Sequence, residues 1–292
     1  MNIQRMSNGK PIRRNSTYRR TRNSKKRYLK IKAMFFFLIS IVTLILIGLS
    51  PLFNITYFEV NGCQHYDKSQ IIDATDIVFG INGFKSVGSN LSDLFTLRYH
   101  NSEKLILNKF AYIRSVKVKF FLPNIVNIDI EERKPLCVVD YFGTKLVLDK
   151  EVYVLETLKA GTKVSLPLIK GIKFDNFKMG QALKIYNYES YNYAIKVINA
   201  IIDLDKSNST VSDKSNSVIL KKGLMKLVNQ VNVQDSSNVW ILVDARLKVK
   251  LGNLKELNDR LTFFREIITK KLKKQDKGSL DMTLIQPVFT PD

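Results

Sequence analysis

One uncharged segment constrains this chain more than any other feature. Residues 33–53, AMFFFLISIVTLILIGLSPLF, run for 21 residues without a charged side chain. A helix needs about 20 apolar residues to cross the ~30 Å hydrocarbon layer of a membrane. A helix buried in a soluble core would carry a polar stripe, whereas this segment is apolar all round. The segment therefore predicts a transmembrane helix from Ala33 to Phe53.

The charges before this segment predict its orientation. Residues 1–32 contain 12 Lys or Arg and no acid, against a net charge of +21 for the whole chain. Lys and Arg concentrate on the cytoplasmic side of membrane helices, so we expect residues 1–32 to be a cytoplasmic tail and the bulk of the chain to lie outside the cell. A cleaved signal peptide usually has a shorter apolar core, and Pro51 makes a poor cleavage site. A basic tail also suits nucleic acid, but beside a membrane helix we expect no nucleic-acid partner.

Residues 54–133 have the pattern of a small α+β domain. Period-two alternation predicts strands, and three- or four-residue spacing predicts helices. The expected order is strand, helix, helix, strand, strand, over residues 54–62, 66–77, 102–113, 112–120 and 125–130, with a Gly- and Ser-rich loop at 80–95. In the second helix we expect Leu105, Leu107, Phe110 and Ile113 to face the core. Two helices on a three-stranded sheet are the expected result.

Residues 134–289 read as a second domain, built mostly of antiparallel strands. Short alternating runs separated by turn residues predict the strands, at 136–143, 144–149, 151–156, 224–234, 238–244, 246–252 and 278–289. Helices are expected near 188–204 and at 253–274, the latter opened by a capping box of Asn253 and Glu256. Residues 205–217 are Ser-, Asn- and Lys-rich and predict a surface loop.

The order of these pieces resembles the FtsQ/DivIB family of bacterial cell-division proteins. The stretch YIRSVKVKFFLPNIVNIDIEERKP is similar to that family's POTRA domain, with its hydrophobic-Pro-Asn turn and its Glu-Arg-x-Pro ending. LVLDKEVYVLE, LPLIKG with GQAL, VKLGNLKELNDRLTFFREII and SLDMTLIQPV resemble the family's β-domain in the family's order. The similarity covers roughly residues 26–289. It implies an α+β protein with a basic tail (1–32), an anchor (33–53), a POTRA domain (54–133) and a β-domain (134–289).

The Glu-Arg-Lys-Pro motif lies where the two expected domains meet. Proline has no N–H and restricts the residue before it, so strand pairing is expected to end there. We therefore interpret Glu132, Arg133 and Pro135 as an interdomain motif, a polar hinge and not a reaction centre.

The resemblance implies a scaffold of the division septum in the cell membrane. Its implied partners are the small bitopic proteins FtsL and FtsB/DivIC, and through them the septal wall synthase. We expect the last strand to leave an open edge to which a partner adds a strand. The expected partner-binding residues are Ser279, Leu280, Asp281, Met282, Thr283, Leu284, Ile285 and Gln286.

We expect no enzymatic activity, cofactor or metal. The two histidines, His65 and His100, are not spaced as zinc ligands. Glu131 and Glu132 are adjacent on a strand, so they point to opposite faces and do not form an acid/base pair. Whether Cys63 and Cys137 form a disulfide stays open at this point. The alternative function is a POTRA-bearing, membrane-anchored assembly or secretion factor.

Overall fold

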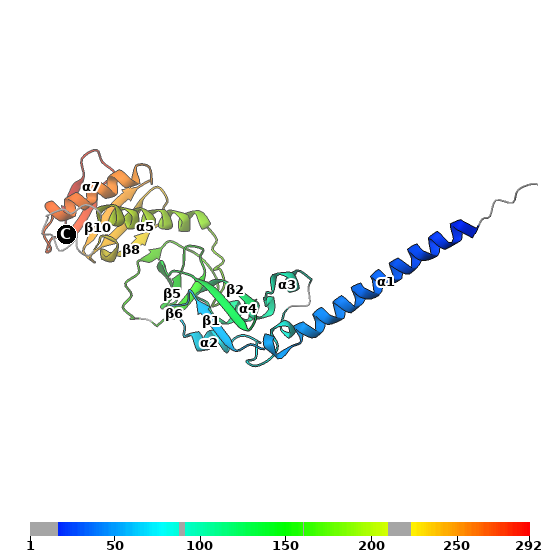
Figure 1. Cartoon of the computed structure of the whole chain (residues 1–292). Helices are drawn as coiled ribbons and strands as arrows, with labels where there is room; N and C mark the ends of the chain where they lie inside the picture. The colour runs from blue at the N-terminus through cyan, green and yellow to red at the C-terminus, as the bar shows by residue number, and fades with distance from the viewer. Residues whose placement is uncertain (1–16, 88–90, 160, 210–222) are drawn as a thin grey trace, which may run out of the picture.

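The chain begins with a long helix that stands apart from two folded sheets. A computed structural model describes residues 17–87, 91–159, 161–209 and 223–292. Helix α1 (Thr17–Gly48) is followed by a 3₁₀ turn, η1 (Pro51–Phe53), and runs away from the rest of the molecule in Figure 1. The predicted cytoplasmic tail lies, for residues 1–16, outside the described residues.

The apolar part of α1 is long enough to cross a membrane. The stretch Arg27–Gly48 has 22 residues, its most apolar 18-residue window has a mean hydropathy of 2.5, and none of that window is buried against the described chain. At 1.5 Å per residue it spans about 33 Å. The helix ends at Gly48 and not at Phe53 as predicted, because Pro51 begins a separate turn whose Leu52 N–H is capped by the Ser50 hydroxyl at 3.3 Å.

The first sheet has three strands with short helices packed on it. Its strand order is β1-β3-β2, in which β1 is parallel and β2 antiparallel to the central β3. The elements are β1 (Tyr57–Asn61), α2 (Lys68–Ile72), η2 (Gly83–Lys85), α3 (Leu91–Thr96), α4 (His100–Lys109), β2 (Ile113–Phe121) and β3 (Ile125–Glu132). The alternating apolar residues of β2 and β3, such as Val118 and Ile128, are fully buried.

Two predictions for this region were wrong in detail. The stretch predicted as a loop at 80–95 contains η2 and α3. On α4 the buried side chains are Ser102, Glu103 and Ile106, while Leu105 and Leu107 are exposed. The register differs because Glu103 is held inside: its carboxylate accepts the Val118 backbone N–H at 2.9 Å and pairs with Arg98 at 2.8 Å.

Within the described residues, the second sheet has nine strands in the order β12-β11-β10-β9-β8-β7-β4-β5-β6. Most neighbours are antiparallel, and the parallel pairs are β4–β7, β7–β8 and β10–β11. The strands are β4 (Cys137–Tyr141), β5 (Thr144–Leu148), β6 (Val154–Leu158), β7 (Leu168–Lys170), β8 (Val228–Asn232), β9 (Val239–Val243), β10 (Leu247–Gly252), β11 (Gly278–Asp281) and β12 (Val288–Pro291).

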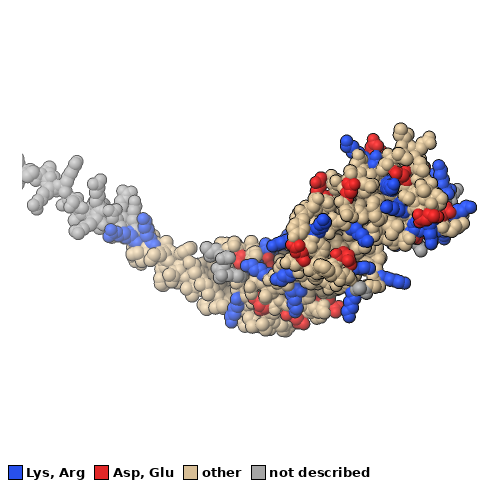
Figure 2. Space-filling model, turned by 180° about the vertical axis from the view of Figure 1, so that it is seen from behind, with Lys and Arg blue, Asp and Glu red and all other residues tan. Residues whose placement is uncertain are grey.

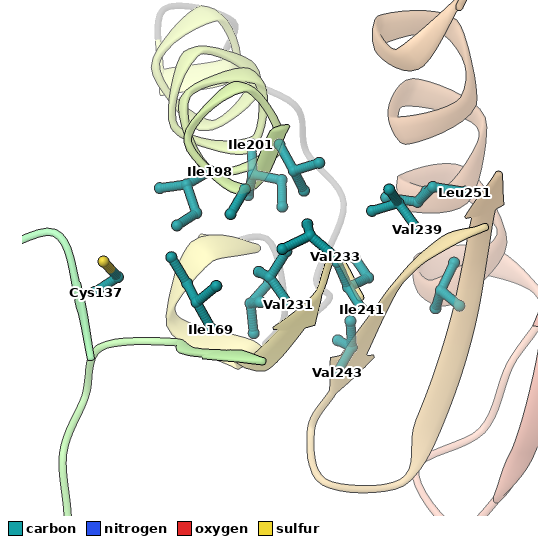
Figure 3. Packing of buried hydrophobic residues seen from close by; sticks show 14 of the residues in the cluster. Cys137, Ile169, Ile198, Ile201, Val231, Val233, Val239, Ile241, Val243 and Leu251 are labelled. Carbon is teal, nitrogen blue, oxygen red and sulfur yellow. The ribbon is translucent and has the colours of Figure 1, made fainter. Parts of the chain in front are cut away.

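Helices α5 (Tyr188–Ser209) and α7 (Leu257–Lys270) build the core of this second sheet, together with the short turn η3 (Met225–Leu227). Figure 3 shows Ile198 and Ile201 above Val231, Val233 and Ile241, all of them fully buried. Burying such side chains removes apolar surface from water at roughly 25 cal/mol per Å². Residues 205–209 of the predicted surface loop continue α5, and 210–222 lie outside the described residues.

The predicted capping box of α7 was wrong, although its apolar stripe was right. The helix begins at Leu257 after Glu256, whose φ of 55° is left-handed and whose side chain makes no cap hydrogen bond. The stripe residues Leu257, Leu261, Phe264 and Ile268 are buried. The predicted class, mixed α+β with an N-terminal apolar helix and a large, mostly antiparallel sheet, is confirmed.

Candidate partner-binding surfaces

The predicted last strand is two strands joined by a turn. The prediction placed one continuous strand over Ser279–Gln286, but β11 ends at Asp281 and β12 begins at Val288. The chain turns because the Asp281 carboxylate accepts hydrogen bonds from the N–H and the hydroxyl of Thr283, at 2.9 and 2.6 Å. These bonds, with Lys250 nearby, lower the pKa of Asp281 despite its partial burial.

This turn corrects the expected open edge. Strand β11 lies between β10 and β12, so Ser279 and Leu280 pair on both sides. Leu280 and Met282 are buried in the core of the second sheet. The four residues Thr283, Leu284, Ile285 and Gln286 are exposed in the turn itself.

Strand β12 provides the edge that the prediction assigned to β11. Among the described residues, β12 pairs with β11 alone. Phe289 packs on the core, while Val288 and Thr290 are exposed. Pro287 and Pro291 flank this edge, and proline donates no backbone hydrogen bond. A partner strand that pairs with β12 therefore finds only a short run of free backbone N–H and C=O groups. The exposed apolar side chains of Leu284, Ile285 and Val288 lie on or just before this strand.

The opposite edge of the nine-stranded sheet is less open. Residues 180–183 run along β6, where the Val154 N–H donates to Gln181 and the Gly180 N–H donates to Val154, at 3.0 and 2.9 Å. The Glu156 carboxylate of β6 accepts a hydrogen bond from the Tyr112 hydroxyl at 3.0 Å. Of the two edges, β12 is the better candidate for strand addition.

The Glu-Arg-Lys-Pro motif lies between the last strand of the first sheet and the first strand of the second, and Arg133 is not a solvated residue. Strand β3 ends at Glu132 and β4 begins at Cys137, and Lys134 and Pro135 are exposed between them. The Arg133 side chain is only 7% exposed and donates to Asp149 at 2.7 Å and to Glu151 at 3.0 Å. Its guanidinium carbon lies 3.5 Å from the centre of the Tyr153 ring. Arg133 is therefore a buried clamp at this junction, while Lys134 and Pro135 beside it stay exposed.

Glu132, the last residue of β3, holds the loop that follows β1 within residues 54–133. Its carboxylate accepts the backbone N–H groups of Gln64 and His65, at 2.8 and 2.9 Å. Burial alone would raise the pKa of Glu132, but these two hydrogen bonds outweigh it, and the pKa is lowered. A cavity of about 300 Å³ opens beside this clamp, lined by Arg114, Glu131, Glu132, Arg133, Lys134, Leu136, Asp149, Lys150 and Asn199.

Tyr112 contacts the second sheet, and other aromatic rings of the first unit pack around it. His65 stacks on Tyr112 with ring centres 3.7 Å apart, and Tyr66 meets Phe110 at 4.6 Å. Tyr112 packs in a small buried cluster with Val138, Val147 and Leu155 of the second sheet. Burial and the hydrogen bond to Glu156 raise the pKa of Tyr112. These contacts join the two sheets through apolar as well as charged groups.

The residues weighed for catalysis do not come together. His65 is occupied by its stacking on Tyr112, and His100 lies at the start of α4 with Nδ1 2.7 Å from an Asp93 oxygen. Within residues 17–87, 91–159, 161–209 and 223–292, three or more His, Cys, Asp or Glu side chains do not gather as metal ligands would. Cys63 and Cys137 are both free thiols, and burial raises the pKa of Cys137 to about 12.

Helix α1, the candidate membrane span, contains Ala33 but not Phe53. Figure 2 shows basic side chains at the start of the described helix, then a stretch without charge, then mixed charges over both folded parts. Phe53 belongs to η1 and packs on Phe84 with ring centres 5.2 Å apart. The C-terminal end of the predicted span, Phe53, therefore packs with the first folded unit, which is the three-stranded sheet and its short helices.

Sequence reasoning missed the partners of Arg133 and the true edge strand. Asp149, Glu151 and Tyr153 lie 16 to 20 positions after Arg133 in a tight turn, and no local pattern connects them. For β12, the sequence did indicate a turn before the strand. Asp281 and Thr283 are residues that favour turns, and Pro287 interrupts the alternating apolar pattern of residues 278–289.

The chain is similar to several curated proteins along most of its length. It is 28% identical over 274 residues to Cell division protein DivIB of Clostridium botulinum strain Hall, covering 93% of this chain and 94% of that protein. Cell division protein DivIB of Clostridium tetani is 25% identical over 221 residues, covering 76% of this chain and 72% of its own length. No protein-family model matches the chain. These relatives confirm the resemblance to the FtsQ/DivIB family over most of the chain, and each of them is named a cell-division protein.

Proposed function

We propose that this protein is a single-pass, non-enzymatic scaffold of the division septum. Its likeness to DivIB proteins along nearly the whole chain is the observation that carries the proposal. One apolar helix followed by two folded sheets suits a protein that is anchored in the membrane and presents binding surfaces beyond it. The alternative, an assembly or secretion factor with a POTRA domain, has no observation in its favour among the described residues.

The proposed topology places the N-terminus in the cytoplasm. The 12 basic residues of positions 1–32 precede the apolar helix, and basic segments stay on the cytoplasmic side. Residues 54–133 and 134–289 are then a POTRA domain and a β-domain outside the cell membrane. The separate buried clusters of the two sheets support this division.

We place partner binding at the end of the second sheet. A bitopic partner of the FtsL or FtsB/DivIC type adds an extended segment to β12, and through it the septal wall synthase is held at the site. Main-chain pairing supplies affinity, and neighbouring side chains supply selectivity. Leu284 and Ile285 of the originally predicted set keep a place in this contact, together with Val288, since all three are exposed beside the edge.

Midcell localisation tests the function itself. A fluorescent fusion of the full chain is expected to gather at the division site, because a divisome scaffold must meet its partners there. An even distribution around the membrane through the division cycle would contradict the proposal.

Charged substitutions test the edge. Ile285→Lys and Val288→Lys put a charge beside the pairing strand, which opposes strand addition. Capture of the bitopic partners from detergent extracts is expected to fall at least about tenfold, which corresponds to about 1.4 kcal/mol. Phe142→Lys is the matched control, because Phe142 is 91% exposed in the β4–β5 turn, away from this edge. Equal capture by all three variants would place the partner contact elsewhere.

A further inference from the structure

Apolar side chains are exposed on the first folded unit close to the end of the membrane helix. The loop before η2 exposes Val78, Phe79 and Ile81, and α3 exposes Leu94 and Phe95. Leu52 of η1 is also exposed. We call these six residues the juxtamembrane patch. Water-exposed aromatic and aliphatic groups in such number mark an interaction surface.

Hydrogen bonds fix the loop of this patch to the last turn of α1. The Asn82 side chain is buried and donates to the carbonyl oxygens of Gly48 and Ser50, at 2.9 and 3.2 Å. The backbone continues the connection, since the Ile55 N–H donates to Ile81 and the Gly80 N–H donates to Ile55, at 3.0 and 2.8 Å. The loop is therefore held beside the point where the chain leaves the apolar helix.

Tyr99, which lies between α3 and α4, binds the segment after α3 to η2, which follows this loop. The Tyr99 hydroxyl is buried and donates to the Gly83 carbonyl at 2.7 Å. The buried carboxylate of Asp93 lies 2.7 Å from His100 Nδ1, which fixes the inner side of α3 and leaves Leu94 and Phe95 exposed. In Figure 1, α3 lies on the side of the first sheet from which α1 leaves.

The distances place this patch at the level of the lipid headgroups. The uncharged part of α1 runs from Ala33 to Gly48 and rises by about 24 Å, so Gly48 lies at or just inside the far boundary of a ~30 Å hydrocarbon layer. Phe79 is three residues from Asn82, hence within about 11 Å of it. Apolar faces of interfacial segments enter the headgroup region by about 5–10 Å. The patch is thus within reach of the same leaflet.

We propose that the juxtamembrane patch rests in the outer lipid interface, with Phe79 and Phe95 inserted between lipids. This inference depends on the membrane anchoring proposed above. The lipid contact then fixes the distance and the orientation of the first folded unit relative to the membrane. Without this contact, the unit would be free to move about its connection to α1. The lipid, and not a partner helix, is the occupant, because the patch is tied to the end of a membrane helix that is itself surrounded by lipid.

Spin-label depth measurements on the full chain in phosphatidylglycerol nanodiscs test this inference. Single labels are attached to Phe79→Cys, Phe95→Cys, Leu44→Cys and Phe142→Cys in a Cys63→Ser background, since Cys137 is fully buried. Phe142 is the matched control because it is 91% exposed, compared with 88% for Phe95, but lies in the second sheet. Leu44 reports whether α1 itself is in lipid.

Labels at positions 79 and 95 are expected to collide more often with dissolved oxygen than with a water-soluble nickel chelate. The order is expected to reverse at position 142. If position 44 is in lipid while 79 and 95 behave like 142, the patch does not touch the membrane, although the anchor stands. If position 44 is also aqueous, the anchoring is wrong, and this inference is wrong with it.

Discussion

At the residue scale, Arg133 decides whether the two sheets stay joined. Replacing it by methionine leaves Asp149 buried without its charged partner, and breaking a buried ion pair costs about 3–5 kcal/mol. We therefore expect Arg133→Met to lower the free energy of unfolding by about 3 kcal/mol. Trp240, the only tryptophan of the chain, lies on β9 and reports the unfolding of the second sheet in urea.

The neighbouring residue provides the control for this measurement. Lys134 is exposed, so Lys134→Met is expected to change the unfolding free energy by less than about 0.5 kcal/mol. Equal effects of the two substitutions would show that the clamp around Arg133 does not stabilise the second sheet.

Glu132, beside Arg133 in sequence, predicts a pH dependence of the stability of residues 54–133. Its folded pKa lies below the unfolded value of 4.5, so its contribution is present above pH 4.5 and is lost as the pH falls through the folded pKa. Glu132→Gln keeps an acceptor oxygen but removes the charge. We expect the variant to melt below the native protein at pH 7 and the difference to shrink toward pH 3, as measured by circular dichroism.

Glu59→Gln is the comparison for this pH series, because Glu59 is exposed on β1. Its melting temperature is expected to follow that of the native protein at every pH. A constant gap between Glu132→Gln and the native protein down to pH 3 would contradict the role assigned to the ionised carboxylate.

At the scale of single elements, α7 illustrates how one face carries the stability. Phe264 is fully buried between α7 and the second sheet, whereas the adjacent Phe263 is 44% exposed. Truncating a buried Phe to Ala removes its transfer free energy and leaves a cavity, at about 3–5 kcal/mol. We expect Phe264→Ala to lower the unfolding free energy by this amount and Phe263→Ala by much less, in urea titrations followed by Trp240. Similar losses would mean that the helix packs in another register.

The elements also show how far the sequence determines the fold. Alternation over residues 113–132 predicted β2 and β3 closely, because a half-buried sheet demands period two. The same logic failed on α4, where the buried Glu103 depends on partners at Arg98 and Val118 that no local pattern indicates. It failed again at Glu256, whose left-handed backbone is imposed by the loop before α7.

For the candidate site, as for the fold, the sequence predicted the position of the elements but not the contacts between distant segments. The sequence located the last strands but joined them into one, so the edge was assigned to β11 when β12 covers it. The interdomain motif was predicted from the resemblance and from Pro135, which ends strand pairing. The partners of Arg133 were not found, because an ion pair between segments depends on how the two sheets pack.

At the scale of the whole molecule, the distribution of charge and apolar surface predicts the topology. The basic tail and the apolar helix are contiguous, and both sheets follow the helix. Holding the tail on the cytoplasmic side therefore exposes every residue from 54 onward to the cell exterior. Protease added to intact protoplasts is expected to degrade residues 54–292 and to leave a protected fragment containing residues 1–48.

A cytoplasmic epitope and a detergent-lysed sample complete this protease experiment. The protected fragment should keep an N-terminal tag in intact protoplasts and lose it after lysis. If residues 54–292 survive in intact cells and disappear only after lysis, the sheets lie in the cytoplasm. In that case β12 would face cytoplasmic proteins, and the extracellular domains of bitopic division proteins would be unable to reach it.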